Sequence, residues 1–215
     1  MDNVINETHI ALILKKCNPI CVSGFHPISL CNVIYKLISK VLANRLKLVL
    51  PNVICQNQSA FIPGGLITDN IIEAYETLHT MHTRMWSKVG FIGIKLDMSK
   101  AYDWVEWPFL EAVMAKMGFN KRWWWLIMKC LQSVYYAILI NDNPVGHIQP
   151  TRGLRQGDPL SPYLFLIYAE ALSSLLIQAE QKGTIIGVPT SKKGPRISHL
   201  FFADDSLLFC KANLV

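Results

Sequence analysis

The sequence contains no C-x-x-C pair, no apolar run expected to span a membrane and no internal repeat. Its six cysteines stand mostly among apolar neighbours, where cysteine behaves as a small hydrophobic residue, so a disulfide framework is not expected. The start Met1-Asp2-Asn3 lacks the charged and apolar regions of a signal peptide. These absences predict an intracellular protein that is neither secreted nor partnered with a membrane.

Four residues near the N-terminus approach the spacing of a small zinc site: Cys17, Cys21, His26 and Cys31. The first gap is one residue too long, and residues 27–31 are expected to begin a helix rather than to close a metal-binding loop. A zinc-stabilised interaction module is therefore a minor alternative.

The composition favours a folded, basic protein. With 215 residues, of which 51% are hydrophobic, the chain can form one domain or a domain and a half around a sizeable core. Lysine and arginine (21) exceed aspartate and glutamate (15), which gives a net charge of +6. This excess suits a polyanion such as nucleic acid, although many unrelated proteins are equally basic.

Hydrophobic periodicity predicts strands alternating with helices. Strands are expected at residues 10–14, 89–97, 135–141, 145–148 and 185–188, and helices at about 29–49, 68–85, 108–117, 123–131 and 161–181. Pro51 is expected to end the first helix. The glycines and unbroken apolar character of strand 89–97 suit a central position that is buried on both faces. The pattern predicts an α+β fold.

A segment near the C-terminus, residues 198–209, organises the functional interpretation. Two short apolar runs flank Ala203-Asp204-Asp205, which predicts a β-hairpin with two adjacent carboxylates at its tip. Neighbouring carboxylates beside large apolar residues repel one another and are poorly hydrated, so a divalent metal is their natural partner. The alternative is a solvated turn, since aspartate is common in turns.

A third carboxylate, Asp97, ends the predicted strand 89–97. If this strand neighbours the hairpin, then Asp97, Asp204 and Asp205 converge and could hold two Mg²⁺ ions for phosphoryl transfer. Hard oxygen ligands without a histidine or cysteine set favour magnesium over zinc.

The loop at residues 152–159 supplies what a nucleotide substrate needs. Gln156 can form side-chain hydrogen bonds, Gly157 permits close approach, and Arg155 can contact phosphate or stack on a base. The ring of Tyr102, five residues after Asp97, could crowd a sugar 2′-hydroxyl, with simple packing as the alternative.

These segments together resemble the reverse transcriptase of non-LTR (LINE-type) retrotransposons, most closely the plant forms. The resemblance rests on Leu96–Asp103, Arg152–Pro162 and Phe202–Asp205, with Pro27–Asn32, Gln58–Phe61 and Leu66–Asn70 also matching, in order from about Ile13 to Lys211.

The resemblance implies a right-hand polymerase with an antiparallel palm sheet and packed helices. Residues 1–88 would form the fingers and 89–215 the palm, with 105–150 alternatively returning to the fingers. Asp97, Asp204 and Asp205 would bind metal, and Tyr102 would be the sugar gate. Gln156 and Gly157 would form the floor of the nucleotide pocket. The partners would be an RNA template, a DNA primer and dNTPs, in the nucleus or cytoplasm.

Three departures from the family pattern bear on activity. His26, Gly65 and Trp104 stand where the family usually has arginine, and at His26 and Gly65 this removes donors that would grip triphosphate or template. The sequence also ends before the expected thumb and lacks the endonuclease region, which suggests a truncated or decayed element. The alternative to an active polymerase is therefore a catalytically silent nucleic-acid-binding remnant of the same domain. The sequence gives no oligomeric state.

Overall fold

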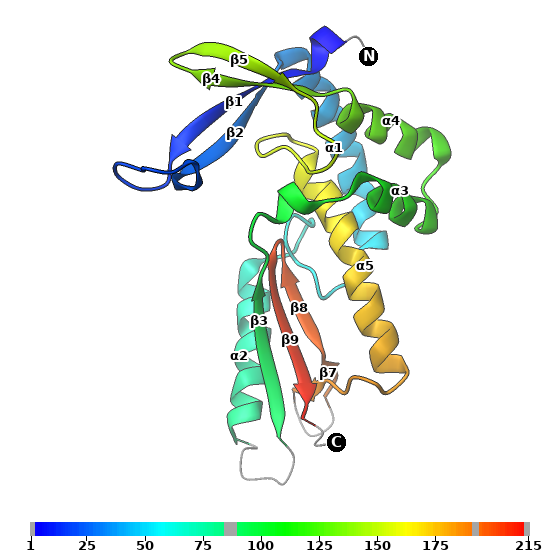
Figure 1. Ribbon diagram of the computed structural model, residues 1–215. Helices are drawn as coiled ribbons and strands as arrows, with labels where there is room; N and C mark the ends of the chain where they lie inside the picture. The colour runs from blue at the N-terminus through cyan, green and yellow to red at the C-terminus, as the bar shows by residue number, and fades with distance from the viewer. Residues whose placement is uncertain (1–2, 84–89, 191–193, 213–215) are drawn as a thin grey trace. The chain divides into compact units, whose positions relative to one another are not determined.

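The computed structural model describes residues 3–83, 90–190 and 194–212, and its elements are shown in Figure 1. The chain forms two compact units: unit 1 comprises residues 1–49 and 100–168, and unit 2 comprises residues 50–99 and 169–215. Each unit is therefore assembled from two separate stretches of chain. The division into fingers (1–88) and palm (89–215) stays a prediction.

Unit 1 contains a four-stranded sheet in the order β2-β1-β4-β5. Its strands are β1 (Glu7–Leu14), β2 (Phe25–Cys31), β4 (Tyr135–Ile140) and β5 (Asn143–Ile148). Strand β1 pairs antiparallel with β2 and parallel with β4. The β4–β5 hairpin turns at Asn141 and Asp142, whose φ angles of 50° and 63° are tolerated better by these two residue types than by most. The strands predicted at residues 135–141 and 145–148 are confirmed and form this hairpin.

The segment expected to begin a helix at residues 27–31 is instead strand β2, preceded by a 3₁₀ turn (Val22–Gly24), so that prediction is wrong. Pro27 lies opposite Leu12 on a strand at the edge of the sheet, where a residue without an N–H is tolerated. Helix α1 (Val33–Val53) follows, and it continues through Pro51 to Val53. Pro51 therefore does not end the helix, which ends two residues later.

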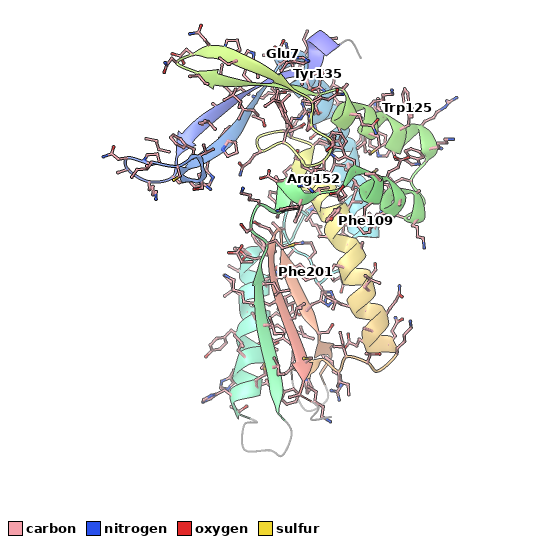
Figure 2. All side chains as sticks on the ribbon, in the orientation of Figure 1. Glu7, Phe109, Trp125, Tyr135, Arg152 and Phe201 are labelled. Atoms are coloured by element: carbon pink, nitrogen blue, oxygen red, sulfur yellow. The ribbon has the colours of Figure 1, made fainter. Side chains whose placement is uncertain are left out.

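Two further helices of unit 1 confirm the sequence reading. Helix α3 (Trp107–Lys116) follows a 3₁₀ turn (Ala101–Trp104); it has proline in its first turn and precedes Gly118, whose φ is 82°. Helix α4 (Lys121–Gln132) is capped by Asn120, whose side chain accepts from the Arg122 N–H at 2.9 Å. Trp125 on α4 is half-exposed (Figure 2).

Helix α5 (Ser161–Gln181) also has the predicted limits. By length and composition it could cross a membrane, contrary to the expectation that no segment could. Four consecutive residues, Leu164 to Ile167, are nevertheless buried in the protein, as in a core helix. The absence of a membrane partner stays a prediction.

Unit 2 contains a three-stranded sheet in the order β3-β9-β8, antiparallel throughout. Its elements are β3 (Phe91–Asp97), β8 (His199–Phe202) and β9 (Asp205–Lys211), with helix α2 (Ile67–Thr83) and the short pair β6 (Val188–Pro189) and β7 (Arg196–Ile197). Val188, Ile197, Leu200 and Phe209 form a buried cluster, against which Ala74 and Met81 of α2 pack. The residues expected at the end of the second helix (85) and at the start of strand 89–97 (89) lie outside the described residues.

The expectation that strand β3 is central and buried on both faces is wrong. It lies at one edge of the sheet and pairs only with β9 among the described strands. Ile92, Ile94 and Leu96 are 45%, 43% and 39% exposed. An apolar run fixes neither the position of a strand in its sheet nor how many faces are covered. Asp97, the last residue of β3, is likewise exposed to solvent.

Candidate active site

The acidic ends of two strands meet in unit 2. Strands β3 and β9 stay in register from Phe91 opposite Lys211 to Asp97 directly opposite Asp205. Directly opposed residues in an antiparallel pair have Cβ atoms about 5 Å apart. The two segments expected to be neighbours are therefore neighbours, and the role of their carboxylates as metal ligands stays a prediction.

Asp204 stands in the turn that joins β8 to β9. Phe202 pairs with Asp205, which leaves Ala203 and Asp204 as a two-residue connection. Ala203 has φ of 54°, a conformation that alanine rarely adopts. Asp204 and Asp205 are both exposed, so the turn presents two carboxylates to solvent.

A segment far away in the sequence fixes this hairpin. Residues 57–59 run alongside β8: the Phe201 N–H donates to the Asn57 carbonyl (2.7 Å), and the Ser59 N–H donates to the Phe201 carbonyl (3.3 Å). Between them, Oε1 of Gln58 accepts from the backbone N–H groups of Ala60 (3.0 Å) and Ala203 (3.2 Å). Residues 58–61 entered the prediction only through the family resemblance, and this contact was not predicted.

A cation already lies beside the acidic pair. Nζ of Lys95 is 3.5 Å from Oδ1 of Asp205, and both side chains are exposed. Across the described ranges, no group of three or more His, Cys, Asp or Glu side chains is placed to hold a metal ion. The backbone register thus brings Asp97 and Asp205 together, while the three carboxylates do not form such a group in the described part of the chain.

A polar network is buried behind the hairpin. The His199 ring contacts Ser198 Oγ at 3.0 Å through Nδ1 and Ser173 Oγ at 2.9 Å through Nε2, and Ser198 donates to Glu180 (3.1 Å). Burial lowers the pKa of His199 from 6.5 to about 4. The histidine is therefore neutral near pH 7 and links β8 to α5 by hydrogen bonds.

The four residues predicted to bind nucleotide lie together in unit 1. The Leu154 N–H donates to the Tyr102 carbonyl and the Gly153 N–H donates to the Val105 carbonyl, both at 2.8 Å. Gly153 has φ of 89°, and a Cβ there would come within 3.2 Å of the Asp103 carbonyl oxygen. Only glycine allows this close approach without strain. The loop is thereby held against Tyr102, whose ring packs on Phe165 at a centroid distance of 5.2 Å.

The tip of this loop lies against β2. The Gln156 carbonyl accepts from the Ser29 N–H at 3.0 Å. Gly157 has φ of 99°, and a Cβ there would come within 3.3 Å of the Ser29 carbonyl oxygen. The side chain of Gln156 and the backbone of Gly157 are exposed. Both remain accessible for the predicted contacts with a nucleotide.

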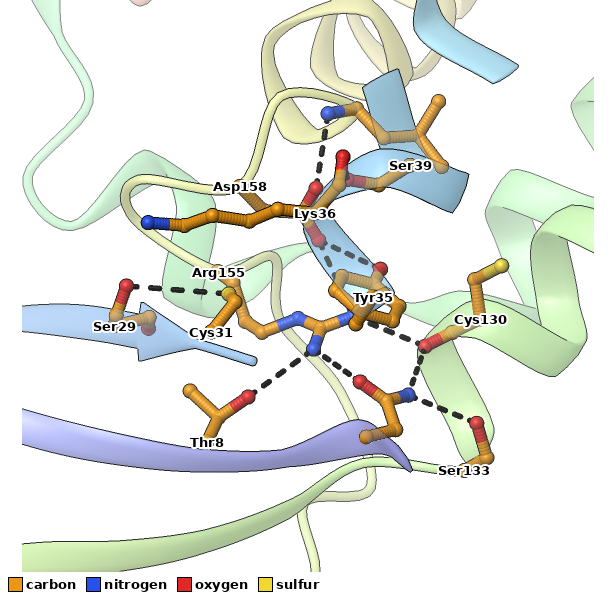
Figure 3. A network of polar contacts seen from close by, with 12 residues as sticks. Thr8, Ser29, Cys31, Tyr35, Lys36, Ser39, Cys130, Ser133, Arg155 and Asp158 are labelled. Atoms are coloured by element: carbon orange, nitrogen blue, oxygen red, sulfur yellow. Dashed lines mark hydrogen bonds and ion pairs between the residues drawn. The ribbon is translucent and has the colours of Figure 1, made fainter. Parts of the chain in front are cut away.

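Arg155, by contrast, is only 2% exposed and lies at the centre of a polar network (Figure 3). Its guanidinium donates to Asn6 Oδ1 (2.6 Å), Thr8 Oγ1 (3.3 Å) and the Cys130 carbonyl (3.1 Å). It forms an ion pair with Asp158 at 3.2 Å and lies 3.9 Å from the centre of the Tyr35 ring. Direct contact of Arg155 with a nucleotide stays a prediction.

Asp158 completes the network. Its carboxylate accepts from the Tyr35 hydroxyl (2.7 Å) and from the Leu160 N–H (3.0 Å), immediately before α5. Burial, with the nearby Asp158 charge, raises the pKa of Tyr35 well above its usual value of 10, so the phenol keeps its proton and donates. The sequence reading missed this partner of Arg155, although the three-residue spacing is visible.

Two of the family's missing arginines can be understood locally. At Gly65, a Cβ would overlap the carbonyl oxygen of Ser59, so no larger residue fits this backbone without a shift. Trp104 is 56% exposed and lies under the Arg152 guanidinium, 4.3 Å from its ring centre. His26 is exposed in β2, opposite Ile13. At Gly65 the local backbone itself therefore disfavours a side chain.

The four residues considered for zinc do not form a site. All of them are described, and no metal-binding group of three includes them. Cys17 and Cys21 are exposed, whereas Cys31 is buried. Burial raises the pKa of the Cys31 thiol, which opposes the thiolate form that zinc requires.

Comparison with known proteins agrees with these features. Residues 13–214 match the family model described as "Reverse transcriptase (RNA-dependent DNA polymerase)". The chain is 35% identical over 145 residues, 67% of its length, to a retrovirus-related Pol polyprotein from the type-1 retrotransposable element R2 of Popillia japonica. It is 28% identical over 93% of its length to an uncharacterized 149 kDa protein of transposon TX1 from Xenopus laevis.

These matches span only parts of longer relatives: 22% of the R2 polyprotein and 15% of the TX1 protein. A plant relative, an uncharacterized mitochondrial protein of Arabidopsis thaliana, is 51% identical over 72 residues, which are 34% of this chain and 59% of that protein. The expected resemblance to the reverse transcriptases of non-LTR retrotransposons is confirmed.

Among solved structures, apo telomerase from Candida tropicalis covers 96% of the chain with a TM-score of 0.62 at 12% identity, and the chain covers 44% of it. At that identity the likeness shows the fold alone. The predicted α+β fold of polymerase type is confirmed. With the family model matching nearly the whole chain, this protein belongs to the reverse transcriptase (RNA-dependent DNA polymerase) family.

Proposed function

We propose that this domain catalyses RNA-directed DNA synthesis, transferring a nucleotide from a dNTP to the 3′-hydroxyl of a DNA primer on an RNA template. One observation carries the proposal: Asp97 faces Asp205 across the β3–β9 ladder, and Asp204 stands in the adjoining turn. Three carboxylates at one exposed end of a sheet are suited to binding the metal ions of phosphoryl transfer.

The donor set suits Mg²⁺. Carboxylate oxygens are the hard ligands that this ion prefers. We propose that Asp97, Asp204 and Asp205 hold the metal. When bound, Mg²⁺ would acidify the attacking hydroxyl and stabilise charge on the leaving phosphate.

The loop of unit 1 is proposed to hold the incoming nucleotide. Gln156 supplies an exposed amide for hydrogen bonds, and the exposed backbone at Gly157 allows a base or sugar to approach closely. The Tyr102 ring, supported by Phe165, would exclude a sugar 2′-hydroxyl by contact. Arg155 would contribute through the loop, because its guanidinium is already engaged with buried partners.

An RNA template fits both charge and likeness. The net charge of +6 favours a polyanion. One of the structural neighbours, telomerase from Candida tropicalis, was solved in complex with a fragment of telomeric RNA, and it covers 96% of this chain at a TM-score of 0.62. We propose that this domain, which has the same fold, copies an RNA template. We also propose that it acts in the nucleus or cytoplasm.

Primer extension tests the proposal. The native chain, supplied with an RNA template, a DNA primer, dNTPs and Mg²⁺, is expected to extend the primer. Asp97→Asn, Asp204→Asn and Asp205→Asn should each lower the rate by about a hundredfold or more, because each removes a metal ligand. Their folds should be as stable as the native one or more so, since carboxylate repulsion is relieved.

Asp142→Asn is the matched control, because Asp142 is an exposed aspartate in the β4–β5 turn of unit 1. It should extend the primer at the native rate. If one of the variants at Asp97, Asp204 or Asp205 also extends the primer at the native rate, that residue is not a metal ligand.

The alternative is a silent nucleic-acid-binding remnant. Gly65 favours it, because its backbone has no room for the arginine that the family pattern places there. RNA binding by the native chain without template-dependent dNTP incorporation would support the remnant and overturn the polymerase.

A further inference from the structure

We propose that Gln58 is a positioning residue for the metal-binding carboxylates, acting through the backbone of Ala203. The inference rests on the proposed function of Asp204 and Asp205, and it adds a residue outside the set argued above. It starts from one hydrogen bond between residues that are 145 positions apart in the sequence.

The side chain of Gln58 is built into the hairpin. It is 3% exposed, and its backbone forms a parallel bridge with Phe201 of β8. Oε1 accepts two backbone N–H groups, from Ala60 at 3.0 Å and from Ala203 at 3.2 Å. Two donors on one atom also identify that atom as the oxygen of the amide. The residue therefore ties the turn to a strand-like segment beside it.

Ala203 needs such a contact more than an ordinary turn residue does. In a two-residue hairpin turn in which only the first central residue has positive φ, that residue is normally glycine, because a Cβ is unfavourable there. Here the residue is alanine at φ of 54°. A hydrogen bond that its N–H donates to a fixed acceptor favours the strained conformation over relaxed ones.

The neighbouring contacts separate this role from simple strand pairing. Asn57, one residue earlier, donates from Nδ2 to the His199 carbonyl at 2.8 Å, at the start of β8 and away from the turn. Asn70 donates to the Phe201 carbonyl, also at 2.8 Å. These bonds hold β8 in place. In the described part of the chain, the side chain of Gln58 forms a hydrogen bond with Ala203, directly before Asp204 and Asp205.

The expected effect is on the metal ligands. The backbone at Ala203 sets the direction in which Asp204 and Asp205 leave the turn, so loss of the Gln58 bond releases both carboxylates. Loss of a group that orients metal ligands typically weakens metal binding by about tenfold or more. Nε2 of Gln58 is buried and has no hydrogen-bond partner among the described residues. Replacing the side chain therefore removes no hydrogen bond of the amide nitrogen.

The test measures Mn²⁺ binding to the full chain by electron paramagnetic resonance, beside the free energy of unfolding in urea. Gln58→Met keeps the shape of the side chain and removes the acceptor; we expect it to weaken Mn²⁺ binding about tenfold. Asn57→Leu is the matched control, since it removes a bond to β8 from the same segment; we expect native Mn²⁺ affinity. Adding Ala203→Gly to Gln58→Met should restore most of the affinity, because glycine adopts positive φ without help.

Native affinity in Gln58→Met, or an equal loss in Asn57→Leu, would overturn the inference and leave the proposed function standing. If the native chain binds no Mn²⁺, the proposed metal site fails, and amide hydrogen exchange at Ala203 decides the inference separately. Faster exchange in Gln58→Met, with native exchange in Asn57→Leu, would support the positioning role. Unchanged exchange in Gln58→Met would overturn it.

Discussion

Lys95 places its ammonium nitrogen 3.5 Å from Oδ1 of Asp205, on the strand next to the hairpin and two residues before Asp97. An exposed ion pair of this kind contributes little to stability. Its charge, however, opposes the approach of a divalent cation to the same carboxylate.

Lys95→Met should therefore tighten Mn²⁺ binding by about three- to tenfold at low ionic strength, by removing one repelling charge. The gain should shrink at high salt as the charge becomes screened. The unfolding free energy should change by less than about 1 kcal/mol. Lys211→Met, at the opposite end of the same strand pair, is the control and should leave binding unchanged. Weaker binding in Lys95→Met would mean that Lys95 assists the site.

Arg155→Met should destabilise the protein by about 3 to 5 kcal/mol, since it leaves the Asp158 carboxylate buried without its ion-pair partner. Arg152→Met is the control. Arg152 forms an exposed ion pair with Glu106 at 3.3 Å, so its loss should cost less than about 1 kcal/mol. Urea unfolding monitored by tryptophan fluorescence gives both values. Similar costs would contradict a central role for the buried network.

Tyr102→Ala should raise ribonucleotide incorporation relative to deoxyribonucleotide by about tenfold or more, if the ring excludes a 2′-hydroxyl. The control is Tyr168→Ala, because Tyr168 also packs on a phenylalanine, Phe109, at a centroid distance of 5.1 Å. Single-nucleotide extension with each substrate gives the ratio. A loss of stability without a change in that ratio would show that Tyr102 only packs on Phe165.

Gly153→Ala and Gly146→Ala separate strain from contact. Both glycines have positive φ, 89° and 80°, so both substitutions cost about 1 kcal/mol in backbone strain. A Cβ at Gly146 meets nothing within 4 Å, whereas at Gly153 it meets the Asp103 carbonyl oxygen at 3.2 Å. Gly153→Ala should therefore cost about 1 kcal/mol more in urea unfolding. Equal costs would show that the loop at residues 152–159 can move away from Tyr102 without a measurable loss of stability.

His199 should make stability depend on pH. Its pKa is about 4 in the folded protein and 6.5 when exposed, so between these values the unfolded chain binds the proton more readily. Stability should fall as the pH drops through this window, by on the order of 2 kcal/mol between pH 7 and pH 5. His199→Gln should remove that part of the dependence, and His79→Gln, at an exposed position, should retain it. Urea unfolding at both pH values measures the difference.

Local signals in the sequence predicted local structure well. Pro108 and Gly118 delimit α3, and Asn141 with Asp142 turns the β4–β5 hairpin, because each residue type restricts the backbone at its own position. The acidic pair was predictable for a related reason. A strand ending in Asp97 and a hairpin with acids at its tip need only be neighbours for the carboxylates to meet.

Features that depend on distant partners could not be predicted. Strand β2 was mistaken for the start of a helix, since its identity comes from pairing with β1, and β3 appeared central because an apolar run does not show how many strands flank it. The bond of Gln58 to Ala203 and the bonds of Arg155 to Asn6 and Thr8 were missed for the same reason. Each joins residues more than 100 positions apart along the chain, and no local pattern marks them.

The network around Arg155 also bears on how unit 1 acquires its structure during synthesis. Its bond to Asn6 joins residues separated by 149 positions, and the Tyr35 hydroxyl bonds to Asp158 across 123. The N-terminal stretch of a growing chain leaves the ribosome long before these partners exist. The buried bonds of Asn6 and Tyr35 can therefore form only after translation has passed residues 155 and 158, and until then these polar groups are hydrated.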